Sequence, residues 1–335
     1  MAKKLYSVCV QDQHKNSEEK VRESLKEMLR SAGIDEWPLT HESHQLYEEV
    51  LEKTGLRPVA TIAPVPHPKS PRYILAVNAP LPRFAAYPDT MMKISSRRQM
   101  HNAYKDLIRV VLNLLCETRK DKFGPKTSSH DDANDYSSTY EEHGSVVEES
   151  QSGAEKEDAI EQIISDIIDV EVNIAQMIVN GRVNDYYQTD TVQNWQKIFG
   201  RFPFYAGLTM DVTRARRTLA NNYEVGVHLL DYFKKLAKYL ETLEVRKLVN
   251  YAGWYFAREV ADVMTLEVRD YLNRFLRTVP KPGIQMVLNQ HHCIDKLIGY
   301  HGVMEAGVAH LYLLRYFSQT AIDEALLICD GFYFS

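Results

Sequence analysis

Histidines and carboxylates are the first residues in this chain to test for chemistry, because both side chains bind Zn²⁺. The helical zinc motif His-Glu-x-x-His is absent, and His41-Glu42-Ser43-His44 is one residue too short. In a helix His41 and His44 would share a face, but no supporting acid or apolar frame accompanies them. We therefore expect both histidines to lie on the surface rather than in a metal site.

Two further groups contain residue types that bind metals. Glu117-x-x-x-Asp121 has the spacing at which some zinc sites place a glutamate ligand and the Asp that supports the site, but no zinc-binding histidines accompany it. His291-His292-Cys293, with His301 and His310, is the densest cluster of potential ligands. Adjacent histidines point to different sides of a helix, which favours core or surface histidines over a metal site. With no Gly-rich phosphate loop and no Gly-x-Ser-x-Gly elbow, the motifs alone do not predict an enzyme.

The four cysteines are Cys9, Cys116, Cys293 and Cys329. None forms a Cys-x-x-Cys pair, which argues against a zinc knuckle or a redox pair. Composition alone favours reduced thiols in a cytosolic protein.

The charge of the chain is unevenly distributed. Its 335 residues carry a net charge of −5, but 126–158 holds ten acids and two lysines, a net charge of −8, which leaves +3 for the remainder. A body so close to neutral argues against a dedicated nucleic-acid surface. No apolar run is long enough to span a membrane, and Met1 to Cys9 lacks the apolar core of a signal peptide.

The longest helical pattern runs over 243–276, where apolar residues recur every three or four positions without a Pro. Thr242 is a candidate N-cap, and Pro280 is a stop signal just beyond the end. We expect one helix of roughly 50 Å along which other elements pack. Trp254 and its aromatic neighbours stand at helical spacing, which indicates core positions.

The remaining patterns predict a mainly α fold with one or two short β-strands. Tyr73–Val77 is the best strand candidate, bounded by Pro71 and Pro80, and Glu224–Val227 is a shorter one. Further helices are expected at Glu18 to Arg30, His44 to Lys53, Ser95 or Ser96 to about Glu117, Asp158 to Val179, Leu230 to Leu240 and about Met286 to Leu327.

The composition divides the chain into three parts. Residues 1–118 form the first part of a helical lobe, and 158–335 form the second part of the same lobe. Between them, 119–157 is rich in Ser, Asp, Glu, Gly and His, with few residues that could build a core. We expect this acidic insert to be a disordered, solvated loop.

Five stretches stand out by their order and spacing. They are Leu5-Tyr6-Ser7-Val8-Cys9, the Gly33–Leu39 turn with Trp37-Pro38, Tyr73 to Pro80 with Tyr87-Pro88-Asp89, Leu248–Trp254 with Asn250-Tyr251, and Cys293 followed by Met304–Tyr312. In this order they resemble the non-catalytic N-terminal lobe of the neprilysin and endothelin-converting-enzyme family of zinc metallopeptidases. The similarity covers most of the chain except the acidic insert and the tail after about Ala325.

The resemblance implies a multi-helical fold like the N-terminal lobe of neprilysin-type peptidases, and a disulfide between Cys9 and Cys293. Such a bridge implies an oxidising compartment, so the expected location is extracellular or a membrane ectodomain. Cys116 and Cys329 are expected to be free thiols. In the family the zinc, its His-Glu-x-x-His helix and the Asn-Ala substrate motif belong to a later lobe, so no catalytic residue, metal ligand or cofactor is assigned to this chain.

The leading hypothesis is therefore the lid lobe of a neprilysin-like zinc endopeptidase that cleaves small peptides, truncated before the zinc site and inactive alone. Its expected partners are the catalytic lobe or a peptide substrate. The alternative is a secreted, catalytically dead relative that binds peptides or a partner protein. A third reading is an intracellular helical scaffold with an accidental resemblance.

Overall fold

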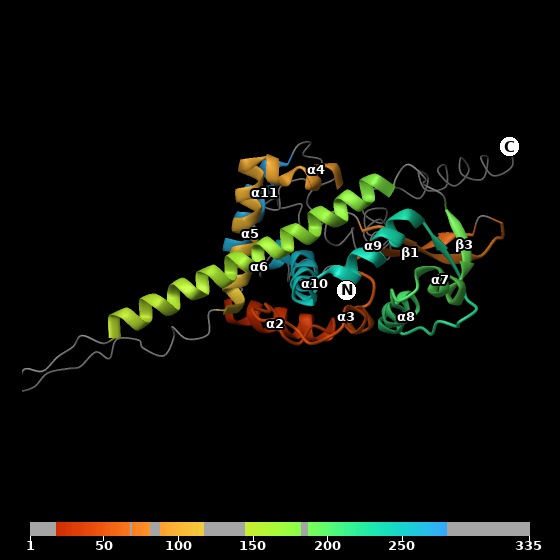
Figure 1. Ribbon diagram of the computed structural model, residues 1–335, viewed down its shortest axis with the longest axis horizontal. Helices are drawn as coiled ribbons and strands as arrows, with labels where there is room; N and C mark the ends of the chain where they lie inside the picture. The colour runs from red at the N-terminus through yellow and green to blue at the C-terminus, as the bar shows by residue number, and fades with distance from the viewer. Residues whose placement is uncertain (1–17, 68, 81–87, 117–144, 182–186, 280–335) are drawn as a thin grey trace, which may run out of the picture. The chain divides into compact units, whose positions relative to one another are not determined.

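The chain folds mainly into helices, as expected (Figure 1). The computed structural model describes residues 18–67, 69–80, 88–116, 145–181 and 187–279, with the backbone alone at 116 and 145–156. The helices are α2 (Glu18–Ser31), α3 (Tyr47–Thr54), α4 (Pro88–Met92), α5 (Arg98–Cys116), α6 (Ser145–Gly181), α7 (Val192–Phe199), α8 (Phe204–Arg214), α9 (Leu230–Thr242), α10 (Val245–Glu259) and α11 (Leu266–Thr278), with 3₁₀ turns η1 (Ile94–Ser96) and η4 (Ala261–Val263). The strands are β1 (Thr61–Pro66), β2 (Tyr73–Asn78), β3 (Gln188–Thr191) and β4 (Glu224–Val227).

The long helix α6 contacts α4, α5, α9 and α10, and its N-terminal part extends beyond the other described helices (Figure 1). Its apolar residues recur every three or four positions and bury one face. The buried apolar side chains of that face are Ile160, Ile163, Ile164, Ile167, Ile168, Val170, Ile174 and Ile178. α6 shares a central role with the 243–276 stretch, whose helices α10 and α11 contact α2, α3, α5 and α6, as the sequence pattern led us to expect.

The expected acidic loop is partly helical, which corrects the sequence prediction. α6 begins at Ser145, so the end of the 119–157 insert belongs to a helix rather than to a disordered loop. The prediction was based on the lack of core-forming residues, but Glu, Gln, Lys and Ala are good helix formers even where nothing is buried. Composition therefore predicted the polarity of this segment correctly and its backbone conformation wrongly. Residues 117–144 lie outside the described part of the chain.

The predicted single helix over 243–276 is interrupted, which is a second correction. α10 ends at Glu259, η4 follows, and α11 begins at Leu266. Thr265 has an extended backbone, and its hydroxyl accepts a hydrogen bond from the Val268 N–H at 3.3 Å, so it is the N-cap of α11. The apolar period continues across the break, and periodicity alone cannot detect an interruption of this kind.

Four strands form one mixed sheet in the order β1-β2-β4-β3. β1 and β2 are antiparallel with Thr61 opposite Asn78, β2 and β4 are parallel with Leu75 opposite Val225, and β3 and β4 are antiparallel. Both predicted strands are confirmed as β2 and β4, and the structure adds β1 and β3. β1 contains Pro64 and Pro66, which an edge strand tolerates because the N–H groups on its outer side have no partner strand among the described residues.

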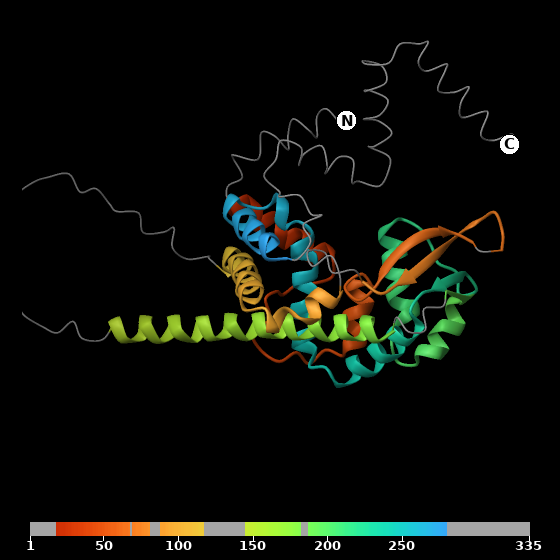
Figure 2. The ribbon, with the colours of Figure 1, turned by 90° about the horizontal axis from the view of Figure 1, so that it is seen from above.

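One face of the sheet packs on a core shared with α7, α8 and α9. Val77, Val225 and Val227 are fully buried on this face. Trp195 of α7 donates its indole N–H to the Val225 carbonyl at 2.9 Å, which fixes the helix to β4. In Figure 2 the β1–β2 hairpin extends away from the helices.

Candidate functional site

The turn after α2 lies directly against the end of α3. Gly33 has a φ of +83°, and the N–H of Ile34 donates back to the Leu29 carbonyl at 2.9 Å, a common way for a helix to end. A Cβ at Gly33 would overlap the Lys53 carbonyl at the end of α3. Glycine is therefore required here by both the backbone conformation and the close approach.

Two of the stretches that carried the family resemblance meet at this turn. The Trp37 indole N–H donates to the Asn250 carbonyl at 3.1 Å. The Asn250 side chain accepts a hydrogen bond from the Leu39 N–H and donates one to the Leu39 carbonyl, both at 2.9 Å. Asn250 is fully buried, and these bonds supply the partners that a buried amide requires. The Trp-Pro turn and the Asn-Tyr helix thus form one structural unit.

Gly253 completes this unit by admitting the tryptophan ring. A Cβ at Gly253 would overlap the indole of Trp37, one turn further along α10 from Asn250. Within Asn250–Gly253, the Asn250 side chain therefore hydrogen-bonds the turn, and the absence of a side chain at Gly253 leaves space for the Trp37 ring. Tyr251 extends the same attachment, because its hydroxyl donates to the Pro58 carbonyl at 2.6 Å.

A cavity of about 520 Å³ opens beside this unit, between the turn, α3 and α10. Its apolar lining comes from Ile34 and Leu39 of the turn region, Val50 of α3 and Val249 of α10. Each of these four side chains is less than a tenth exposed. The cavity therefore has an apolar floor that belongs to the protein core.

Carboxylates surround this floor. Asp35, Glu36, Glu42 and Glu49 line the cavity together with the single cation Lys53. Glu49 accepts a hydrogen bond from the Leu46 N–H at 3.2 Å, before the first turn of α3. Within the described residues Asp35, Glu36 and Glu42 form no ion pair, and all three are exposed. The rim is therefore an uncompensated negative surface over an apolar floor.

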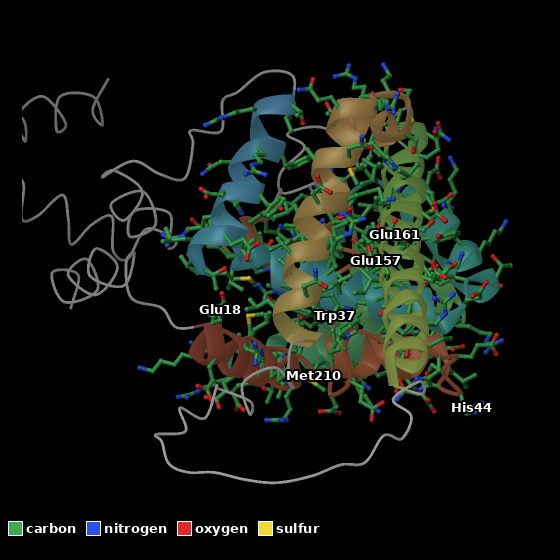
Figure 3. The ribbon with its side chains drawn as sticks, turned by 90° about the vertical axis from the view of Figure 1, so that its left-hand side faces the viewer. Glu18, Trp37, His44, Glu157, Glu161 and Met210 are labelled. Carbon is green, nitrogen blue, oxygen red and sulfur yellow. The ribbon has the colours of Figure 1, made fainter. Side chains whose placement is uncertain are left out.

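His41 and His44 lie on the same rim and are exposed, as the sequence predicted. In Figure 3 His44 lies at the outer edge, whereas Trp37 lies among the helices. Neither histidine is helical, because α3 begins only at Tyr47. Among the described residues no group of three or more His, Cys, Asp or Glu side chains is arranged to hold a metal ion.

A second cavity, of about 450 Å³, lies at the end of the sheet beside Tyr73 and Tyr223. Of its two carboxylates, Glu224 pairs with Arg72 and lies 3.2 Å from His67 Nε2, and Asp190 accepts hydrogen bonds from the Thr191 N–H and the Asn194 side chain. Both carboxylates of this cavity therefore have partners within the chain, unlike Asp35, Glu36 and Glu42 beside the Trp-Pro turn.

A buried polar network joins α5, α6 and α10. Glu171 pairs with Arg258, and the Tyr104 hydroxyl donates to Glu171 at 2.5 Å. Trp254, fully buried as predicted, donates to the Tyr104 oxygen at 2.9 Å. Burial and the adjacent Glu171 raise the pKa of Tyr104 far above its ordinary value. The network therefore connects three helices, and each of its side chains is less than a tenth exposed.

Asp211 of α8 holds the segment after α3. Its carboxylate accepts a hydrogen bond from the Leu56 N–H at 2.7 Å, and Arg214 donates to the Lys53 and Thr54 carbonyls. Burial raises the pKa of Asp211 to about 6 despite this hydrogen bond and the nearby Arg214. Sequence inspection did not single out Asp211, because its partner lies 155 residues away.

Several predicted residues lie outside the described part of the chain. These are Cys9, Glu117, Asp121, His291, His292, Cys293, His301, His310 and Cys329. Cys116 is the last residue of α5, and its side chain is not described. The Cys9–Cys293 disulfide and the free thiols therefore stay predictions.

The comparison with protein families decides the relationship. A model described as peptidase family M13, for the N-terminal part of its members, matches residues 1–330. The chain belongs to peptidase family M13. This confirms the resemblance to the N-terminal lobe of neprilysin-type metallopeptidases that the Trp-Pro turn and the Asn-Tyr helix suggested. A search of curated proteins finds no match to this M13 chain.

A solved structure with low sequence identity shares the fold. The zinc metalloprotease Zmp1 of Mycobacterium tuberculosis, in its open state, aligns with a TM-score of 0.59 and 16% sequence identity over 98% of this chain and 47% of Zmp1. An inhibitor complex of the same protein gives a TM-score of 0.49 and 15% identity, over 96% of this chain and 46% of that one. This M13 chain thus spans about half the length of these relatives. Within the described residues, no helix has the length and apolar character that crossing a bilayer requires.

Proposed function

We propose that this chain is the non-catalytic lobe of a neprilysin-like zinc metalloendopeptidase that acts on small peptides. The observation that carries the proposal is the M13 match over residues 1–330, in which two family stretches form one unit through Trp37 and Asn250. In this role the lobe restricts access to a catalytic lobe rather than carrying out chemistry. Its partners would be that lobe and the enclosed peptide, in an extracellular or ectodomain setting with the Cys9–Cys293 bridge formed.

Peptide hydrolysis by this family needs a metal-activated water and therefore metal ligands. The resemblance assigns those ligands to a lobe beyond the family segment that this chain matches. We therefore propose that residues 1–335 bind no catalytic zinc and do not cleave peptides alone. Cleavage would require the half of the relatives' length that this chain does not cover.

The first test is an activity assay on the purified chain with added zinc and a set of fluorogenic peptides. We expect no cleavage above the rate of a zinc-only blank. Zinc-dependent cleavage that phosphoramidon inhibits would refute the proposal, since it would place a complete catalytic site within residues 1–335.

The second test is the transcript sequence beyond the codon for Ser335. A frame that continues into a His-Glu-x-x-His segment would support a lobe of one enzyme, and the longer protein should then show the missing activity. A stop codon directly after Ser335 would count against that assignment. It would favour the alternative, a secreted relative without catalysis that binds peptides or proteins, for which the open cavity beside the Trp-Pro turn is the supporting feature.

A further inference from the structure

The cavity beside the Trp-Pro turn combines an apolar floor with a rim of carboxylates. Its floor of Ile34, Leu39, Val50 and Val249 is apolar, yet it is reached from outside through a cavity of about 520 Å³. Pockets that bind small groups are typically apolar with a few polar side chains at defined places.

The charge around this cavity is one-sided. Four carboxylates face one ammonium group, so the lining carries a net charge of −3 when its histidines are counted as neutral. Some other described carboxylates have a cationic partner within the chain, such as Glu48 with Arg201 and Glu224 with Arg72. Asp35, Glu36 and Glu42 have none among the described residues. The missing positive charge must come from solvent ions or from a ligand.

The side chains that line the cavity favour an organic cation over a metal ion. A bound divalent ion needs several converging oxygen or nitrogen ligands, and no such group exists among the described residues. A lysine or arginine side chain matches better, because its aliphatic stem covers apolar surface while its cationic head stays at a polar rim. The apolar floor matches the aliphatic stem of such a side chain, and the carboxylates of the rim match its cationic head.

We propose that this cavity binds a lysine or arginine side chain of a basic peptide segment. The stem lies over Val50 and Val249, and the head lies among Asp35, Glu36 and Glu42. The inference does not rest on the proposed function, because binding of this kind needs neither zinc nor a second lobe. It adds a peptide-binding site on this chain and names the class of residue that it accepts.

The test is calorimetric titration of the full 335-residue chain with an acetylated and amidated lysine-rich peptide. We expect binding that weakens by about tenfold between about 20 and 200 mM NaCl, since exposed charge pairs are screened. A glutamate-rich peptide of the same length should not bind. Failure of the lysine peptide to bind at low salt would overturn the proposal.

Variants locate the site. The triple variant D35N/E36Q/E42Q removes the unpaired charges of the rim and should weaken binding by about tenfold, as expected for three exposed charge contacts. The matched control E23Q/E52Q/E241Q removes three exposed acids outside the cavity and should change binding by less than about twofold. Equal weakening in both variants would indicate attraction to net charge alone and would overturn the proposal. If the triple variant unfolds, the single charge reversal E42K repeats the comparison.

The apolar floor has its own test. Replacing each lysine of the peptide by diaminobutyrate keeps the charge at neutral pH but shortens the stem by two methylenes. We expect at least about threefold weaker binding, because part of the lost stem area is buried on the floor. Unchanged affinity would show that the floor makes no contact and would overturn the proposed mode of binding.

Discussion

At the scale of single residues, the Trp-Pro turn is held against α10 by the side-chain amide of Asn250 and by the lack of a side chain at Gly253. Asn250 satisfies both backbone polar groups of Leu39, and Gly253 leaves room for the Trp37 ring. Their part in the family resemblance is explained by packing between segments that are more than 200 residues apart.

The first prediction concerns Gly253. In an exposed helix Gly→Ala stabilises by about 1 kcal/mol, but here the added methyl overlaps the Trp37 ring. We expect Gly253→Ala to lower the free energy of unfolding by about 1–3 kcal/mol, the usual cost of overpacking. Urea denaturation measures it.

The control for this prediction is the double variant W37L/G253A. A leucine is smaller than the indole, so the penalty of the added methyl should largely vanish in the W37L background. A stabilising effect of Gly253→Ala in the wild-type background would contradict the observed contact.

The second prediction concerns Asp211. Its pKa is raised from 3.8 to about 6 in the folded state, so the folded protein binds this proton more tightly than the unfolded chain. The resulting stabilisation is complete below pH 3.8 and is lost as the pH rises through about 6. In Asp211→Asn this contribution is absent.

Denaturation at several pH values measures the difference. Between about pH 4 and pH 7 the wild-type protein should lose up to about 3 kcal/mol of unfolding free energy relative to D211N. Asparagine keeps an oxygen that can accept the Leu56 hydrogen bond, so the variant should still fold. Identical pH profiles for the two proteins would show that the Asp211 proton does not contribute.

At the scale of elements, the break between α10 and α11 makes Thr265, rather than Thr242, the N-cap of a helix. The apolar pattern favoured one helix starting after Thr242, whereas the structure places an N-cap at Thr265. Thr242 instead ends α9 and donates its hydroxyl to the Tyr239 carbonyl at 3.0 Å. The two threonines therefore have opposite roles at helix ends.

The third prediction follows from these roles. Thr265→Ala should lower the free energy of unfolding by about 1 kcal/mol, because it removes the acceptor for a helix N–H group. Thr242→Ala is the matched control and should change stability by less than about 0.5 kcal/mol, since its hydroxyl is exposed. A larger effect at Thr242 than at Thr265 would support the uninterrupted helix instead.

At the scale of the whole molecule, the family resemblance assigns one covalent link, between Cys9 and Cys293. Both residues lie outside the described part of the chain, so the link is a prediction from the resemblance alone. Such a bridge would close nearly the whole chain into one loop. In the chain-entropy model a loop of that length contributes roughly 5 kcal/mol, a model-dependent upper value.

The fourth prediction is that peptide mapping without reductant identifies a Cys9–Cys293 cross-link in protein made in an oxidising compartment. Reduction should then lower the midpoint of thermal unfolding. The variant C116S/C329S is the control and should keep the cross-link, because these cysteines are expected to be free. Free thiols at positions 9 and 293 would contradict the family pairing.

The sequence by itself determined the mainly α class, the family, and the elements whose signals are local. β2 and β4 could be predicted because each is a short run rich in apolar residues, and most helices because their apolar period is continuous over ten or more residues. Trp254 was assigned to the core for the same reason. His41 and His44 were assigned to the surface because no supporting acid or apolar frame accompanies them.

Only the tertiary structure decided the features that depend on distant residues. The cavity needs Val249 beside Ile34 and Val50, the Glu171–Arg258 pair joins helices 87 residues apart, and β1 is a strand because β2 pairs with it. None of these contacts leaves a local pattern, because burial and pairing are set by whichever residues the folded chain brings together. The period of a helix fixes which face is buried, but not what lies against that face or where the helix breaks.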